Sequence, residues 1–274
     1  MKKIKLCHIK LALSALLFSV TTFTANAQKL PNVQQTSLLA PVNVKIDGKA
    51  NEWGETLQAY NKATEIYYTL ANDDENIYLT IQVKNEDIIN KIIDGGVSLI
   101  IQKSGGKKSR DNISVTYPAY DTPNNKSKLR FNLSNSGIPN ADSLMLINNA
   151  KLDKNCKLIK VTGIAGTDSL ISIYNSEGIK AASLFNTSKV YTIEMSIALK
   201  YLDISTIGAT KFAYHLLLNG ATPLDWRNIH PRAPADGSVG TLEYMQDAIK
   251  KAVDLDAPIS TPTDFWGEYT LAKK

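Results

Sequence analysis

The clearest pattern of hydrophobic and polar positions lies in residues 65–83, EIYYTLANDDENIYLTIQV. Hydrophobic side chains occupy every second position in two arms: Ile66, Tyr68, Leu70, Ile77, Leu79, Ile81 and Val83. Alternation with period two, rich in β-branched and aromatic residues, is typical of half-buried strands. The run 72–76 between the arms has the short polar side chains that turns favour. The stretch therefore predicts a β-hairpin with an acidic, solvated turn.

Similar short patterns predict further strands along the chain. They cover residues 42–46, 97–103, 113–117, 129–133, 144–148, 157–162, 169–174, 179–184, 190–197, 211–218 and 267–272. Residues 211–218, KFAYHLLL, are apolar on both faces, which predicts a central strand covered on both sides. Helical spacing of apolar residues occurs in 86–93 and 242–254.

About a dozen short strands without βαβ alternation predict an all-β fold. The expected architecture is an antiparallel two-sheet β-sandwich, jelly-roll or immunoglobulin-like, with one or two short helices. No shift in composition divides residues 42–274, so we expect a single domain there, preceded by an extended lead-in over 28–41.

The first 27 residues have the features of a secretory signal peptide. Four lysines precede a short apolar stretch, Leu11 to Val20, and Ala25-Asn26-Ala27 has the form of a cleavage site. The apolar stretch is too short for a membrane-spanning helix, and no later run is long enough. We expect an exported chain beginning at Gln28, periplasmic or extracellular, without a membrane span.

Charge and cysteine content exclude several function classes. The formal charge of +5 comes mostly from the four lysines of residues 1–27, which leaves 27 basic against 26 acidic residues in the remainder. No nucleic-acid partner is expected, because such a partner needs a concentrated basic surface. Cys156 is the one thiol after residue 27, so no internal disulfide is expected, and we interpret it as a partly buried strand-end residue.

Recognisable catalytic motifs are absent from the sequence. There is no G-x-S-x-G, no H-E-x-x-H, no paired metal-ligand spacing and no phosphate-binding glycine loop. His215 is best interpreted as a hydrogen-bonded histidine of the core or of the second strand face. A glycosidase would need two carboxylates from distant segments, such as Asp225 with Glu194 or Asp236.

Aromatic and polar loop residues offer a different chemistry. Sugars present flat C–H faces ringed by hydroxyls, so their sites combine aromatic rings with planar hydrogen-bonding groups. The candidates are Trp226 with Asp225, Arg227 and Asn228, then Trp266, and then Tyr117 and Tyr120. The alternative for each tryptophan is that it covers an end of the core, which is the role expected of Trp53.

Several segments resemble the family 9 carbohydrate-binding module and its wider group of DOMON-like β-sandwiches. Residues 44–53 (VKIDGKANEW) resemble its "IDG…W" opening, and 72–79 (NDDENIYL) are similar to its "D-D-E-N-L-Y" hairpin. Residues 191–202 resemble a third motif, with Ala198 in place of the usual proline, and 211–219 resemble a late strand that leads to an Arg-bearing loop, here Arg227.

The resemblance implies a sandwich that binds a polysaccharide or oligosaccharide, and it allows a structural calcium ion. Family members hold sugars between two tryptophans, and here Trp226 or Trp266 is placed to form one wall, with Tyr117 or Tyr120 as a replacement for the other. We therefore expect an exported, non-catalytic carbohydrate-binding protein. The alternatives are a structural or protein-interaction module of the cell envelope and, less favoured, a glycoside hydrolase.

Overall fold

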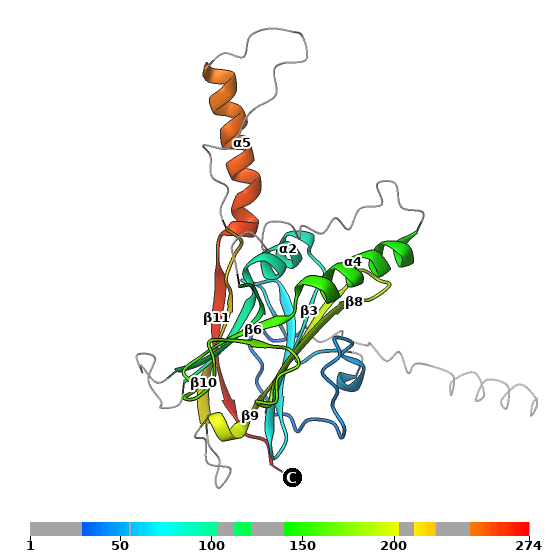
Figure 1. The fold of residues 1–274 in the computed structure, drawn as a ribbon, viewed down its shortest axis with the longest axis vertical. Helices are drawn as coiled ribbons and strands as arrows, with labels where there is room; N and C mark the ends of the chain where they lie inside the picture. Colours follow the sequence, from blue (N-terminus) through cyan, green and yellow to red (C-terminus); the bar gives the residue numbers. More distant parts are fainter. Residues whose placement is uncertain are drawn as a thin grey trace, which may run out of the picture.

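The structure, a computed structural model, describes residues 29–54, 56–102, 112–121, 140–202, 211–222 and 242–273. Two antiparallel sheets pack face to face around one core (Figure 1). The first has the order β1-β2-β3-β9-β8, and the second has the order β11-β10-β4-β5-β6-β7. The predicted antiparallel β-sandwich is confirmed.

The strands of the first sheet are β1 (Ala59–Asn61), β2 (Ile66–Asn72), β3 (Asn76–Val83), β8 (Ile179–Phe185) and β9 (Tyr191–Ala198). Those of the second are β4 (Val97–Gln102), β5 (Asn112–Ala119), β6 (Leu158–Thr162), β7 (Leu170–Ser172), β10 (Lys211–Leu218) and β11 (Thr263–Thr270). The helices are η2 (Asn51–Trp53), α2 (Glu86–Gly95), α4 (Ala141–Asn155), η3 (Leu199–Tyr201) and α5 (Leu242–Ser260).

The predicted hairpin is formed by β2 and β3, and its alternating side chains enter the core. Ile66, Tyr68 and Leu70 are each 0% exposed. In the turn, Asp73 accepts hydrogen bonds from the backbone N–H groups of Glu75 and Asn76 and from the Tyr78 hydroxyl. The acidic turn is therefore stabilised by one of its own carboxylates.

A buried pair of tyrosines connects the two sheets. The hydroxyl oxygens of Tyr68 in β2 and Tyr214 in β10 lie 2.9 Å apart, and the Gln34 N–H donates to the former. Phe265 packs against both rings. Gly267 lies opposite Tyr214 in the β10–β11 register, and a Cβ at Gly267 would overlap the end of the Tyr214 ring.

Residues 38–57 cover part of the outer face of the first sheet. Trp53 is 8% exposed and packs against Tyr78, so its expected role as a core cover is confirmed. Beneath this cover, Glu194 is 0% exposed and accepts hydrogen bonds from the Trp53 indole and from the N–H groups of Asp47 and Gly48. Burial raises the pKa of the Glu194 carboxyl above its ordinary value, and these three donors limit the rise.

The structure corrects several local predictions. Residues 42–46 form turns and irregular backbone instead of a strand, and 144–148 lie inside α4. The side chain of Asn140 accepts a hydrogen bond from the Ser143 N–H and so begins that helix, which outweighs the local alternation. The predicted strand 129–133 and the signal peptide 1–27 lie outside the described residues. The helices are longer than expected, because α4 spans 15 residues and α5 spans 19.

The helix α5 projects from one end of the sandwich beyond α2 (Figure 1). Its C-terminal end packs near α2, where Asp256 and Ile259 are buried. Most of the rest of the helix is exposed, including Leu242 and Leu255 at 73% and 78%. No helix within the described ranges is long and apolar enough to cross a membrane.

Gly267→Ala tests the contact between Gly267 and the Tyr214 ring. The added methyl group must displace a ring that is packed on every side, so we expect the free energy of unfolding to fall by about 1–3 kcal/mol. Urea denaturation measures the change. The matched control is Thr270→Ala on the outward face of the same strand, which should leave the stability within about 0.5 kcal/mol. An unchanged midpoint for Gly267→Ala would contradict the packing.

Glu194→Gln tests the buried carboxylate. The amide nitrogen would face another donor, the Trp53 indole or a backbone N–H, so the variant should lose about 1–3 kcal/mol of stability near neutral pH. The folded-state pKa of Glu194 lies above its ordinary value of 4.5. Its contribution to the free energy of unfolding is therefore fully present below pH 4.5, and it is lost as the pH rises through the folded-state pKa. Urea denaturation at a series of pH values should show this decline in the wild type and a flatter profile in the variant.

Candidate functional site

The structure describes three of the seven predicted site residues. Trp226, Arg227, Asp225 and Asn228 all fall in the range 223–241, which lies outside the described residues. The other three, Trp266, Tyr117 and Tyr120, lie on the second sheet or directly beside it.

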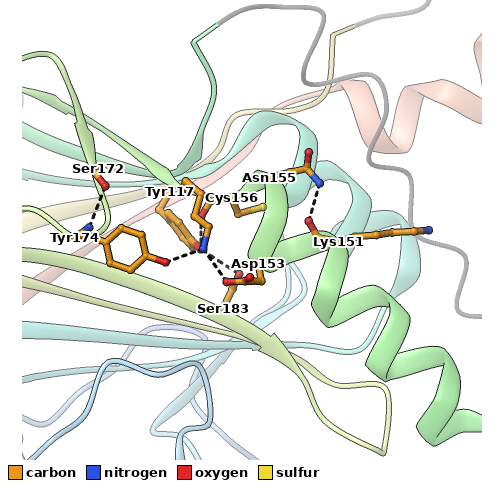
Figure 2. Close-up of polar contacts among 9 residues, drawn as sticks. Tyr117, Lys151, Asp153, Asn155, Cys156, Ser172, Tyr174 and Ser183 are labelled. Atoms are coloured by element: carbon orange, nitrogen blue, oxygen red, sulfur yellow. Dashed lines mark hydrogen bonds and ion pairs between the residues drawn. The ribbon is translucent and has the colours of Figure 1, made fainter.

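Tyr117 does not present its ring at the surface, which corrects its prediction as a wall of a sugar site. It is 3% exposed, its hydroxyl donates to the Cys156 carbonyl at 3.2 Å, and Ser183 Oγ lies 3.3 Å away (Figure 2). Tyr120 is half-buried and its hydroxyl donates inward to the Ile93 carbonyl. Both rings follow the inward side of β5 and its continuation, so they stabilise the core.

Cys156 is not placed to act as a nucleophile. It lies at the C-terminal end of α4 instead of at a strand end, and it is 2% exposed (Figure 2). Burial raises the pKa of its thiol to about 11. Since the thiolate is the nucleophilic form, this cysteine is inert at neutral pH.

Trp266 points outward from β11 and stacks on His215 of the neighbouring strand. The two rings are 4.3 Å apart at their centroids and only 4° from parallel. The register explains this contact, because His215 and Trp266 are directly opposite in the β10–β11 pairing. The result is an aromatic surface, a stacked pair of half-buried rings, on the outer face of the second sheet.

His215 is held in place by a carboxylate. Its Nε2 lies 2.7 Å from Asp264 Oδ2, and since an ionised carboxylate only accepts, Nε2 carries the hydrogen. The histidine side chain is 15% exposed, which confirms the hydrogen-bonded second-face role. The prediction that this strand is covered on both sides was wrong in part, since its outward residues are half-buried or exposed.

A cleft of about 440 Å³ adjoins this aromatic surface. Its lining includes Trp266, Ala213, Gln102 and the ion pair between Lys211 and Glu268. The small Ala213 side chain lies between Glu268 and Gln102 in the strand register, with larger residues around it. A small residue surrounded by large ones produces a depression, and its volume falls within the range of small-molecule sites.

Gln102 has an unusual environment for a residue beside a cleft. It follows Val97, Leu99 and Ile101, which enter the core, so its side chain belongs to the outer face of β4. It is nevertheless 1% exposed, and neither its amide nitrogen nor its amide oxygen has a hydrogen-bond partner among the described residues. The Oδ1 of Asn112, opposite Gln102 in register, is likewise buried and unpartnered within the described chain.

The acidic side chains on this face are engaged by basic ones. Glu268 pairs with Lys211, and Asp264 pairs with His215. No group of three or more His, Cys, Asp or Glu residues that could hold a metal occurs in the part of the chain that the structure describes. The face therefore offers an aromatic surface, amide groups and paired charges.

Sequence reasoning found Trp266 but missed His215 as its partner, and it missed Gln102 and Ala213 altogether. The sequence does indicate which face of the sheet Gln102 occupies. Residues 97, 99 and 101 alternate toward the core, which places residue 102 on the outer face. Its closeness to Trp266 was not available, since that depends on the order of strands in the sheet.

Comparisons with known proteins complete the description. No protein-family model matches the sequence, and no curated protein matches it significantly. Among solved structures, the chain is similar to a carbohydrate binding module family 9 domain from Caldicellulosiruptor kristjanssonii in complex with glucose. The TM-score is 0.41 and the sequence identity 11%, over 87% of this chain and 97% of that chain.

Proposed function

We propose that this chain is an exported, non-catalytic carbohydrate-binding protein whose site is the outer face of β11, β10 and β4. The observation that supports this proposal most directly is the Trp266–His215 stack beside the cleft at Ala213. Export rests on the signal-peptide features of residues 1–27, and the single domain over 42–274 remains a prediction.

The chemistry of the face suits a sugar ring. An aromatic plane attracts the C–H face of a pyranose through dispersion and burial of apolar surface. The stack on His215 and the bond from His215 to Asp264 keep the Trp266 ring from rotating freely, so little side-chain entropy is lost on binding. Amide groups at the cleft then offer both donors and acceptors to hydroxyls.

Two adjacent clefts favour an oligosaccharide over a single sugar. A second cleft of about 340 Å³ lies beyond the Lys211–Glu268 pair and is lined by residues 33–37 and 268–270. The two clefts share that ion pair, so a chain of several sugar rings could contact both. A polysaccharide or oligosaccharide is therefore the proposed partner.

The described carboxylates argue for binding without catalysis. Glycosidases need two carboxyl groups that face the scissile bond from either side. Glu194 is buried beneath residues 47–53 on the other sheet, and Asp264 and Glu268 are engaged by basic partners. Asp225 and Asp236 lie outside the described residues. The predicted loop Asp225–Asn228 stays a proposal as a further sugar contact, as does a structural calcium ion.

A protein-interaction module remains the second candidate, and α5 is the observation that favours it. Leu242, Met245, Val253 and Leu255 are exposed on a helix that projects from the sandwich. Of these, Leu242, Met245 and Val253 share one side of the helix, and an exposed apolar side of a helix is a common docking element. Leu242→Ser with Leu255→Ser separates the two functions, because it alters the helix and leaves the Trp266 face intact.

Trp266→Ala should weaken oligosaccharide binding about tenfold or more, because it removes the aromatic surface. Calorimetry against soluble hexaoses of β-1,4-linked glucose, mannose and xylose and of β-1,3-linked glucose measures the effect. Circular dichroism should show an unchanged fold, since Trp266 lies outside the core.

Tyr174→Ala is the matched control. Tyr174 is 75% exposed and contacts Lys157 on a different part of the surface (Figure 2). The control should bind as the wild type does. Binding of no saccharide by the folded wild type, or equal binding by Trp266→Ala, would overturn the proposed function.

A further inference from the structure

A buried amide without partners has a free-energy cost that the fold does not recover by itself. Such a group loses its hydrogen bonds to water on burial and gains none in the protein, so its burial is unfavourable. Native proteins leave few side chains in this condition. Both amide atoms of Gln102 are buried without partners in the described chain. Stability therefore does not explain why a glutamine occupies this position instead of an apolar residue.

The position of Gln102 in the sheet suggests that its amide serves the cleft. It lines the same depression as Trp266, and Ala213 lies between it and Glu268 in the register. The adjacent Asn112 Oδ1 adds a third unpaired amide atom on the same face. Among the described residues, hydrogen-bonding groups without partners therefore lie on the β4 side of the cleft.

We propose that Gln102 determines specificity by binding a pair of adjacent hydroxyl groups on a neutral sugar ring whose C–H face lies on Trp266. This inference rests on the proposed function of the face. A primary amide offers an acceptor oxygen and two N–H donors in a single plane, and two neighbouring ring hydroxyls can pair with the oxygen and with one of these N–H groups. Rotation about the side-chain torsions brings the amide to a ligand that enters over Ala213.

The charges around the cleft favour a neutral ligand. Lys211 and Glu268 pair with each other at its edge, and His215 pairs with Asp264 behind the aromatic surface. An acidic sugar would have to compete with Glu268 for Lys211, the one lysine among the described residues that line the cleft. A neutral sugar binds without breaking either pair.

The linkage of the sugar chain should therefore affect affinity. Internal rings of β-1,4-linked glucose, mannose and xylose keep free hydroxyls at both carbon 2 and carbon 3. Internal rings of β-1,3-linked glucose have carbon 3 substituted and keep no adjacent pair. We expect the β-1,4-linked hexaoses to bind more tightly than the β-1,3-linked hexaose.

Gln102→Leu provides the decisive test, because it separates binding from stability. Leucine fills similar space without polar atoms, so the variant should be as stable as the wild type or more stable. It should also bind the β-1,4-linked hexaoses at least about tenfold more weakly, having lost two hydrogen bonds to the ligand. Calorimetry and urea denaturation on the full mature chain give both quantities. Gln82→Leu, at a half-buried position on the first sheet, is the matched control and should bind unchanged.

Each outcome decides the question. Unchanged binding by Gln102→Leu would overturn the role of Gln102, and marked destabilisation would show that its amide has a structural purpose instead. Tighter binding of the β-1,3-linked hexaose would contradict recognition of adjacent hydroxyls. In all three cases loss of binding in Trp266→Ala would leave the proposed function standing, whereas no binding of any hexaose by the wild type would remove both proposals.

Discussion

The register between β10 and β11 is the constraint on which the candidate site depends. Tyr214 lies opposite Gly267 in this pairing, and the tyrosine ring occupies the space that any side chain at Gly267 would need. Tyr214 also reaches across the core to Tyr68, so the inward face of β10 is specified by contact with the other sheet. A slip of one residue would turn every side chain of β11 to the opposite face. The core contact therefore holds Trp266 on the outside, against His215.

The outer faces of the two sheets differ in how far other segments cover them. Residues 38–57 cover part of the first sheet, and the buried Glu194 of β9 accepts hydrogen bonds from two of their backbone N–H groups and from the Trp53 indole. The second sheet keeps an aromatic stack and a cleft on its outer face. The first sheet therefore has a covered part on its outer face, and the second sheet has a cleft on its outer face.

Local alternation was sufficient to predict much of the fold. The hairpin of β2 and β3, the strands β5, β8, β9 and β10 and the buried Trp53 follow from patterns within a few residues. Helix α4 was missed because its start depends on a side-chain cap at Asn140, which a strand-like pattern at 144–148 concealed. Tyr117 was assigned to the surface although it continues the inward series of Ile113 and Val115.

The candidate site could be predicted only in part, because it is assembled from strands that are distant in sequence. Trp266 was identified by its residue type, but its neighbours are about 50 and 160 positions away. The connection runs through the strand order β11-β10-β4, and no local pattern encodes that order. Residue chemistry alone also favoured charged and aromatic groups over a glutamine, whose interest comes from its lack of hydrogen-bond partners among the described residues.

The unpaired Gln102 amide connects stability with function in this fold. A leucine at this buried position on the outer face of β4 would remove a free-energy cost, so stability alone does not explain the glutamine. Binding sites commonly keep polar groups that are unsatisfied until a ligand arrives, because those groups then reject ligands that cannot pair with them. If Gln102 acts in this way, the aromatic surface supplies affinity for many sugars and the amide selects among them. The residues that supply affinity and selectivity would then lie on β11 and β4, the two strands that flank β10.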